Sequence, residues 1–188
     1  EAVLQNLLVR TPLRHHDLRA RTSYPHELLR HFLLEMLQSM PPDFRCQVYE
    51  AAGDIYRRAG NNKKAVECFF QAGNDEQLLS CQLIGLMGET FGQIGYTALA
   101  RRVLQRCPQE ILAQYPLSVL RLCLALFGGT DFRGFEEALE QSRCIVEQTG
   151  SRQLMGEWYL LSAFQEFPDI PRMTARYQKA AALMTAPS

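Results

Sequence analysis

The sequence has no excess of charge of either sign, no long apolar run and no closely spaced pair of cysteines. Its 188 residues include 20 Lys+Arg and 20 Asp+Glu, so the overall charge draws the chain neither to nucleic acid nor to an anionic membrane. No stretch reaches the roughly 18 uncharged apolar residues that a membrane span needs, and no signal peptide is recognisable. We therefore expect a cytoplasmic protein that makes no direct contact with a membrane or with nucleic acid.

The six cysteines are spread over apolar stretches and show none of the close pairing that zinc sites and redox motifs use. A free cysteine behaves as a small buried hydrophobe. We expect all six to be reduced and mostly buried, as in a cytosolic protein. They are Cys46, Cys68, Cys81, Cys107, Cys123 and Cys144.

Apolar residues recur at intervals of three and four along nearly the whole chain, which is typical of helices. Prolines fall mainly between these stretches, where the missing amide disturbs a helix least. The pattern predicts an all-α fold, whereas residues 1–24 have turn and strand character. Helices are expected at residues 25–39, 43–59, 62–72, 75–93, 96–106, 109–115, 117–127, 133–149, 153–166 and 170–184.

The stretch "VYEAAGDIYRRAGNNKKAVECFFQAGND", which begins at Val48, has the pattern of one repeat unit. Gly53 and Ala65 would let two helix backbones approach closely, while Tyr56 and Phe69 fill the space beside that contact. This is the spacing of a tetratricopeptide unit, an antiparallel helix pair whose remaining apolar face is covered by the next pair. We therefore predict a tetratricopeptide-like right-handed superhelix of such pairs.

Further motifs stand around this unit in a fixed order. "SYPHELLRHFLLEML" precedes it, and "AGNDEQLLSCQLI", "ALARRVLQRCPQEILAQYPLSVLRLCLALFGG" and "GEWYLLSAFQEFPD" continue from its end. This succession resembles the middle region of the large ATP-binding LuxR-type transcriptional regulators, the maltose-regulon-activator-like family. The resemblance covers residues 23–184.

The resemblance implies a parent protein with an N-terminal signal-transduction ATPase module and a C-terminal helix-turn-helix module. Residues 1–24 would be the remnant of a preceding winged-helix-like segment, and residues 25–188 the tetratricopeptide-like domain, which is implied to sense the inducer and to contribute to self-association. The chain begins at Glu1 and ends in "TAPS", as expected of an excised segment. Because it contains no Walker A sequence, we expect no cofactor here, and ATP only in the upstream module.

Four glycines would form one stripe along a helix, and each costs about 1 kcal/mol relative to alanine in a helix interior. One interpretation is a broken or tightly packed helix that joins two units. The other is a hinge that lets the two halves of the array rotate. The residues are Gly85, Gly88, Gly92 and Gly95.

In tetratricopeptide arrays, polar positions on the first helix of each pair line the concave side and supply ligand contacts. Arg121 stands out among them, because its helix is otherwise almost wholly apolar; its guanidinium could pair with a carboxylate across the groove or with an anionic or polyhydroxyl group of an effector. The alternative is that these side chains are merely solvated. The predicted groove for an effector or partner comprises Glu50, Asp54, Arg57, Ser118, Arg121, Tyr159, Ser162 and Glu166.

Catalytic and metal-binding arrangements find no support. The four histidines (15, 16, 26 and 31) all lie near one end, none at i, i+4 spacing and none near a cysteine, so we expect neither a metal site nor a catalytic triad. Arg101, Arg102 and Arg106 lack interleaved aromatics, which favours a solvated face over nucleic-acid binding.

The sequence therefore predicts a non-catalytic sensory and oligomerisation region of a bacterial LuxR-type transcriptional regulator. Its expected partners are a small-molecule or protein effector, the neighbouring ATPase and helix-turn-helix modules, and a second copy of the chain. The alternative function is a general tetratricopeptide scaffold that holds a peptide in its groove and has no DNA-linked output.

Overall fold

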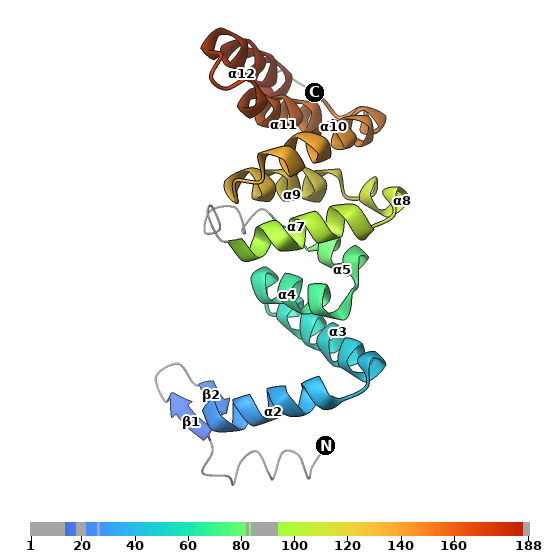
Figure 1. Cartoon of the computed structure of the whole chain (residues 1–188), viewed down its shortest axis with the longest axis vertical. Coiled ribbons are helices and arrows are strands. Elements are labelled where there is room, and N and C mark those ends of the chain that lie inside the picture. The colour runs from blue at the N-terminus through green and yellow to red at the C-terminus, as the bar shows by residue number, and fades with distance from the viewer. Residues whose placement is uncertain (1–13, 18–21, 26, 82, 84–93, 186–188) are drawn as a thin grey trace. The chain divides into compact units, whose positions relative to one another are not determined.

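A computed structural model describes residues 14–17, 22–25, 27–81, 83 and 94–185, and these residues are helical apart from one small hairpin and the connections (Figure 1). The predicted all-α class is thus confirmed for the described chain. Among the helices that can be searched, none combines the length and the apolar character needed to cross a membrane.

The chain divides into two compact units, Glu1–Val48 and Tyr49–Ser188. The first contains strands β1 (Arg14–Asp17) and β2 (Thr22–Pro25), which pair antiparallel, and helix α2 (Glu27–Ser39). The strand character expected before residue 25 is confirmed for these two segments. The domain boundary expected at residue 24 stays a prediction, because compactness does not show which segment belongs to a preceding domain.

The remaining helices follow the predicted order closely. Most begin and end within two residues of the expected positions, since the apolar periodicity and the prolines mark them. They are α3 (Pro42–Arg58), α4 (Asn62–Ala72), α5 (Asp75–Ser80), α7 (Ile94–Arg106), α8 (Gln109–Leu112), α9 (Pro116–Gly128), α10 (Phe132–Thr149), α11 (Arg152–Ser162), the 3-10 helix η2 (Ala163–Glu166) and α12 (Ile170–Thr185).

Short polar side chains start several of these helices. Asn61, Asn74, Asp131 and Ser151 each accept a hydrogen bond from the backbone N–H three residues further on, which satisfies one of the free amides at a helix N-terminus. These caps explain why connections of two or three residues suffice between consecutive helices.

The helix predicted over residues 75–93 does not run on without a break from Asp75, and residues 82 and 84–93 lie outside the described residues. Helix α5 ends at Ser80, and Cys81 has extended backbone angles (φ −67°, ψ 128°). The apolar periodicity continues past this point, but Cys81 is buried together with Leu78 and Leu79. Leu78, Leu79 and Cys81 are apolar because they are buried in the core, and their pattern does not require the helix to continue past Ser80.

The close contact predicted inside the 48–75 unit is confirmed. Gly53 is buried, and a Cβ atom on it would lie 2.6 Å from the Phe69 ring. Ala65 is fully buried as well. The two helices α3 and α4 therefore meet through a small residue facing an aromatic ring, as the spacing indicated.

From α7 onwards, consecutive helices pack on one another: α9 contacts α7, α10 and α11, and α11 contacts α10 and α12. Buried apolar residues of α7, α9, α10 and α11 belong to one core, in which the single tryptophan, Trp158, donates a hydrogen bond to Leu139 O at 2.9 Å. Helix α10 turns four apolar side chains into this core, namely Phe135, Ala138, Leu139 and Ile145.

All six cysteines are free, as predicted, and Cys81, Cys107 and Cys123 are buried. Cys46 and Cys68 are half-buried. Cys144 departs from the expectation, because it is exposed on α10.

Candidate effector groove

Glu50, the first predicted groove residue, connects α3 to the beginning of α5. Its Oε1 accepts a hydrogen bond of 2.8 Å from Asn74 Nδ2. The same Asn74 caps α5 by accepting a bond from the Gln77 backbone N–H at 3.1 Å. Glu50 therefore fixes the start of α5 through the capping residue.

Arg57 stands at the centre of a second set of bonds between α3 and α5. Its Nη1 donates to Gln77 Oε1 at 2.6 Å and to Ser80 Oγ at 3.2 Å. Its Nη2 donates to Asp54 Oδ1 at 2.8 Å, and its guanidinium lies 5.5 Å from the centre of the Phe69 ring. Arg57 and Asp54 are thus occupied by partners within the fold, which gives them a positioning role for α5.

Asn74, Gln77 and Ser80 were not among the predicted residues. A signal for them was present, because they follow one another at intervals of three from the N-cap of α5 to its last residue. Such spacing places side chains on neighbouring parts of one helix face. The groove prediction covers only polar residues on the first helix of each expected pair, and residues 75–80 fall within a longer predicted helix.

Ser118 and Arg121 lie on α9 beside a pocket of about 280 Å³. Ser118 is buried, and its hydroxyl donates to Leu79 O at 2.7 Å, which ties α9 to α5. The polar part of the pocket wall is formed by Ser80, Cys81, Gln114, Tyr115, Ser118 and Arg121. The remainder is apolar and includes Leu79 and Leu83.

Arg121 is half-buried between α9 and α11. Its Nη2 lies 3.4 Å from Glu157 Oε2, and the two side chains are only 18% and 20% exposed. The Nε–H of Arg121 is buried and has no hydrogen-bond partner among the residues that the structure describes. Leaving a buried donor unpaired costs about 1–3 kcal/mol, so a ligand oxygen that reached this N–H would recover part of that cost.

No family model, curated protein or solved structure matches the chain. The functional conclusions below therefore rest on the geometry of its own residues.

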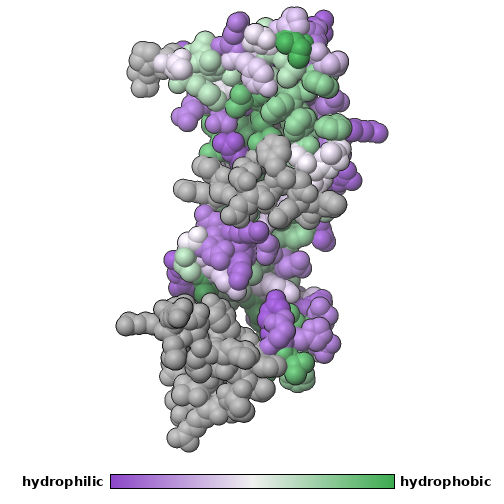
Figure 2. Space-filling view, turned by 90° about the vertical axis from the view of Figure 1, so that its left-hand side faces the viewer, coloured by the Kyte–Doolittle hydropathy of each residue, from purple (hydrophilic) through white to green (hydrophobic). Residues whose placement is uncertain are grey.

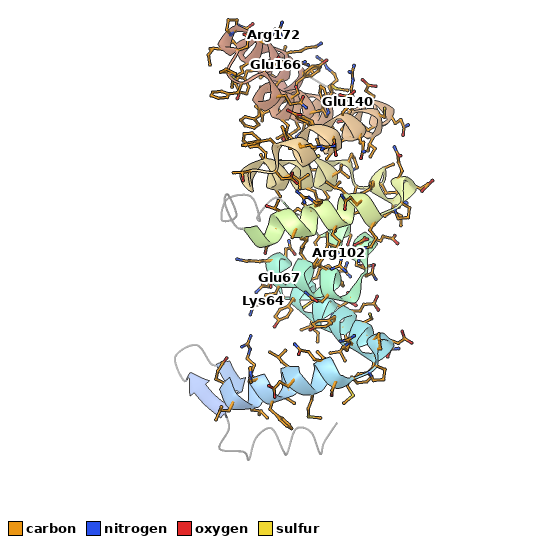
Figure 3. The ribbon with its side chains drawn as sticks, viewed as in Figure 1. Lys64, Glu67, Arg102, Glu140, Glu166 and Arg172 are labelled. Carbon is orange, nitrogen blue, oxygen red and sulfur yellow. The ribbon has the colours of Figure 1, made fainter. Side chains whose placement is uncertain are left out.

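The last group of predicted residues lies around the end of α11. Tyr159 and Glu166 line a second pocket, of about 480 Å³, together with residues of α12. Glu166 and Arg172 are labelled in this part of Figure 3. Ser162 is a correction to the predicted groove: it is fully buried, and its hydroxyl donates to Tyr159 O at 2.9 Å.

Of the four hinge candidates, Gly85, Gly88 and Gly92 lie outside the described residues. Gly95 is in the first turn of α7. The hinge thus stays a prediction.

The arginines of α7 are exposed, as expected of a solvated face, and each also has a partner within the fold. Arg101 Nε donates to Asp131 Oδ2 at 3.0 Å, and the Arg102 guanidinium lies 5.4 Å from the centre of the Phe70 ring; Figure 3 labels Arg102. Arg106 makes a two-pronged pair with Asp75, in which Nε donates to Oδ2 at 2.8 Å and Nη2 donates to Oδ1.

These partners lower the pKa of the Asp131 carboxyl, mainly through the Arg101 hydrogen bond, and raise the pKa of Arg106 through its bond to Asp75. Each pair joins α7 to another helix, so the arginines hold the fold together. Over the described parts of the chain, no group of three or more His, Cys, Asp or Glu side chains is placed to hold a metal ion.

Proposed function

We propose that this chain is the non-catalytic sensory and oligomerisation region of a cytoplasmic LuxR-type transcriptional regulator, and that it binds a small-molecule or protein effector in a groove formed by α5, α9 and the connections next to them. The observation that carries the proposal is the pocket beside Arg121. It combines an apolar wall with a few convergent polar groups, which is the usual composition of a small-molecule site.

The proposed architecture is a superhelix of tetratricopeptide-like helix pairs. It is supported by the Gly53–Phe69 contact within the first pair and by the packing of each later helix on its neighbours in sequence. In such arrays each pair contacts only the adjacent pairs. An effector bound between α5 and α9 would therefore fix the relative placement of successive pairs, and that placement can be passed on to neighbouring modules.

Arg121 and Glu157 give this idea a chemical basis. One guanidinium edge is held by Glu157, while the Nε–H has no partner. An oxygen of the effector that accepts from the guanidinium would form a charge-assisted bond, which is shorter and about twice as strong as a neutral one. Glu157, a partly buried carboxylate, would then serve to orient Arg121.

The test is Arg121→Ala in the full-length regulator. We expect the free energy of effector binding to weaken by about 1–3 kcal/mol, the contribution of a hydrogen bond to a charged group. The effector concentration that gives half-maximal transcriptional activation should rise by the corresponding factor. Arg133→Ala is the matched control, because Arg133 is 90% exposed on α10 and its ion pair is with Glu137 on the same helix. Unchanged effector affinity in Arg121→Ala would show that the arginine serves only to hold α9 against α11.

A peptide-binding scaffold without DNA-linked output is the second candidate. Exposed apolar side chains favour it, because Phe132, Phe167 and Ile170 are 55%, 70% and 60% exposed, and Figure 2 shows hydrophobic surface over the helices at the C-terminal end. Large exposed apolar groups often mark protein interaction sites. The complete reading frame separates the two: a Walker A motif upstream and a helix-turn-helix module downstream support the regulator, whereas absence of both supports the scaffold.

A further inference from the structure

The pocket beside Tyr159 is unusually rich in positive charge. Its wall consists of Tyr159 from α11, Glu166 from η2, and Arg172, Ala175, Arg176 and Lys179 from α12. Three of these six residues are cations and one is an anion. Asp169 adds a second carboxylate, which lies 3.3 Å from Arg172 Nε. Three positive charges against two negative ones leave a net charge of +1 at the pocket.

The cations share one side of α12. Arg172, Arg176 and Lys179 are spaced by four and three residues, so they project from neighbouring positions along one helix face. Helix α12 itself contains no Asp or Glu. The positive charge of this face is therefore balanced only by carboxylates that other segments bring to it.

That balance is incomplete. Arg176 donates to Glu166 through Nε at 3.2 Å and Nη2 at 2.9 Å, but both bonds end on the same oxygen, Oε1. Arg172 lies 4.0 Å from the other oxygen, Oε2. Lys179 Nζ lies 4.4 Å from the centre of the Tyr159 ring, and no ion pair joins Lys179 to a carboxylate among the described residues.

We propose that this pocket binds a small organic anion, whose phosphate or carboxylate oxygens contact Lys179, Arg172 and Arg176. Arginine forks match these oxygens in geometry, and lysine adds a point charge. The volume of about 480 Å³ is in the range of small-molecule sites and exceeds what a bare ion needs. The apolar body of the ligand would lie beside Tyr159.

Glu166 has a particular part in this site. It is the internal carboxylate that already occupies Arg176, with 19% of its side chain exposed. An incoming anion competes with Glu166 for the same donors, so the carboxylate weakens the apparent affinity of the pocket for anions. Only an anion that bonds these donors better than Glu166 does would displace it. Anion binding at this pocket is a property of the isolated chain, and it is independent of the effector site proposed beside Arg121, which shares no residue with it.

Trp158 provides a built-in reporter. It is the only tryptophan, and its ring centre lies 5.2 Å from that of Tyr159. The 188-residue chain is titrated at low ionic strength with inorganic phosphate, glucose 6-phosphate and benzoate, with glucose as the neutral control. Tryptophan fluorescence and calorimetry are read in parallel. We expect saturable binding of at least one anion, none of glucose, and weakening by added salt, because exposed charges are screened. The phosphate and benzoate arms distinguish the two anion types.

Variants decide the assignment. Lys179→Met and Arg172→Gln should each weaken anion binding about tenfold. Glu166→Gln should tighten it, because the competing carboxylate is gone. Arg133→Gln, the exposed arginine on α10, should leave it unchanged. Thermal unfolding checks that each variant is folded. If Lys179→Met does not fold, Arg172→Gln still tests the proposal, because the Arg172 side chain is 74% exposed and its replacement should leave the fold intact.

Three results would overturn the proposal. One is the absence of saturable binding for every anion at millimolar concentration. Another is equal binding by wild type and Arg172→Gln. The third is weaker binding in a folded Glu166→Gln variant, which would make Glu166 a supporting residue.

Discussion

The contact between Gly53 and Phe69 offers the sharpest test of the helix pairing. In Gly53→Leu the new Cβ would lie 2.6–2.9 Å from three ring atoms of Phe69, a separation that real Cβ atoms essentially never show. The ring is fully enclosed, since Phe69 is 1% exposed, and the Arg57 guanidinium lies near it. Either the ring or the whole of α4 must therefore move.

The magnitude follows from two opposing effects. Overpacking a closed core by a few carbons costs about 1–3 kcal/mol and sometimes more, so four carbons placed against a ring should cost about 4 kcal/mol. Replacing a helical glycine by leucine returns about 1 kcal/mol through helix propensity. The net loss is about 3 kcal/mol, which for a chain of this size lowers the melting temperature by about 6–12 °C.

The assay is thermal and urea unfolding followed by circular dichroism. Ala51→Leu is the control, because Ala51 is exposed on the same helix and its enlargement should change stability by less than about 0.5 kcal/mol. Phe69→Ala should rescue Gly53→Leu, since the vacated ring space accepts the new side chain, with a coupling energy of about 0.5–3 kcal/mol. A melting temperature of Gly53→Leu equal to that of wild type would refute the packing of α3 on α4.

The remaining predictions concern ionisable groups. Burial raises the pKa of the Cys123 thiol to about 12, so a thiol reagent at pH 8 should label Cys144 first and Cys123 only after unfolding; prompt labelling of Cys123 in the folded chain would contradict its burial. The Arg101 hydrogen bond lowers the pKa of Asp131 below its ordinary value of 3.8, so its stabilising effect is present above that value and disappears as the pH falls through the folded pKa. Arg101→Gln should therefore destabilise the chain at pH 7, and the difference from wild type should shrink in acid unfolding; a difference independent of pH would exclude this pair as its source.

The positions of the helices could be predicted because local signals mark them. Asn61 and Ser151 cap the helices that follow them, and Gly73 and Gly150 end helices in left-handed conformations (φ 76° and 64°) that favour glycine. The Gly53–Phe69 contact was predictable for a similar reason, because a small and a large residue on facing helices fit only one way.

The partners of the groove residues could not be predicted, since they depend on how distant helices are rotated. Arg121 was expected to meet a carboxylate across the groove, yet nothing in the spacing singles out Glu157, which comes from α11. Ser162 shows the limit of helical spacing itself. Three residues after Tyr159 it is rotated by about 60° relative to it, which is enough to take a side chain from the edge of the pocket into the core.

The two-pronged pair between Asp75 and Arg106 joins α5 to α7 directly, in addition to the backbone that connects these two helices. Asp75 is at the start of α5 and Arg106 at the end of α7. In addition, the hydroxyl of Ser118 on α9 donates a hydrogen bond to the backbone oxygen of Leu79 on α5. All of these contacts are made by residues outside the stretch between α5 and α7. A break in the backbone between α5 and α7 would thus leave two fragments that are still joined by an ion pair, a hydrogen bond and packed apolar surface. The two fragments would then associate without a covalent link, as the subunits of a heterodimer do.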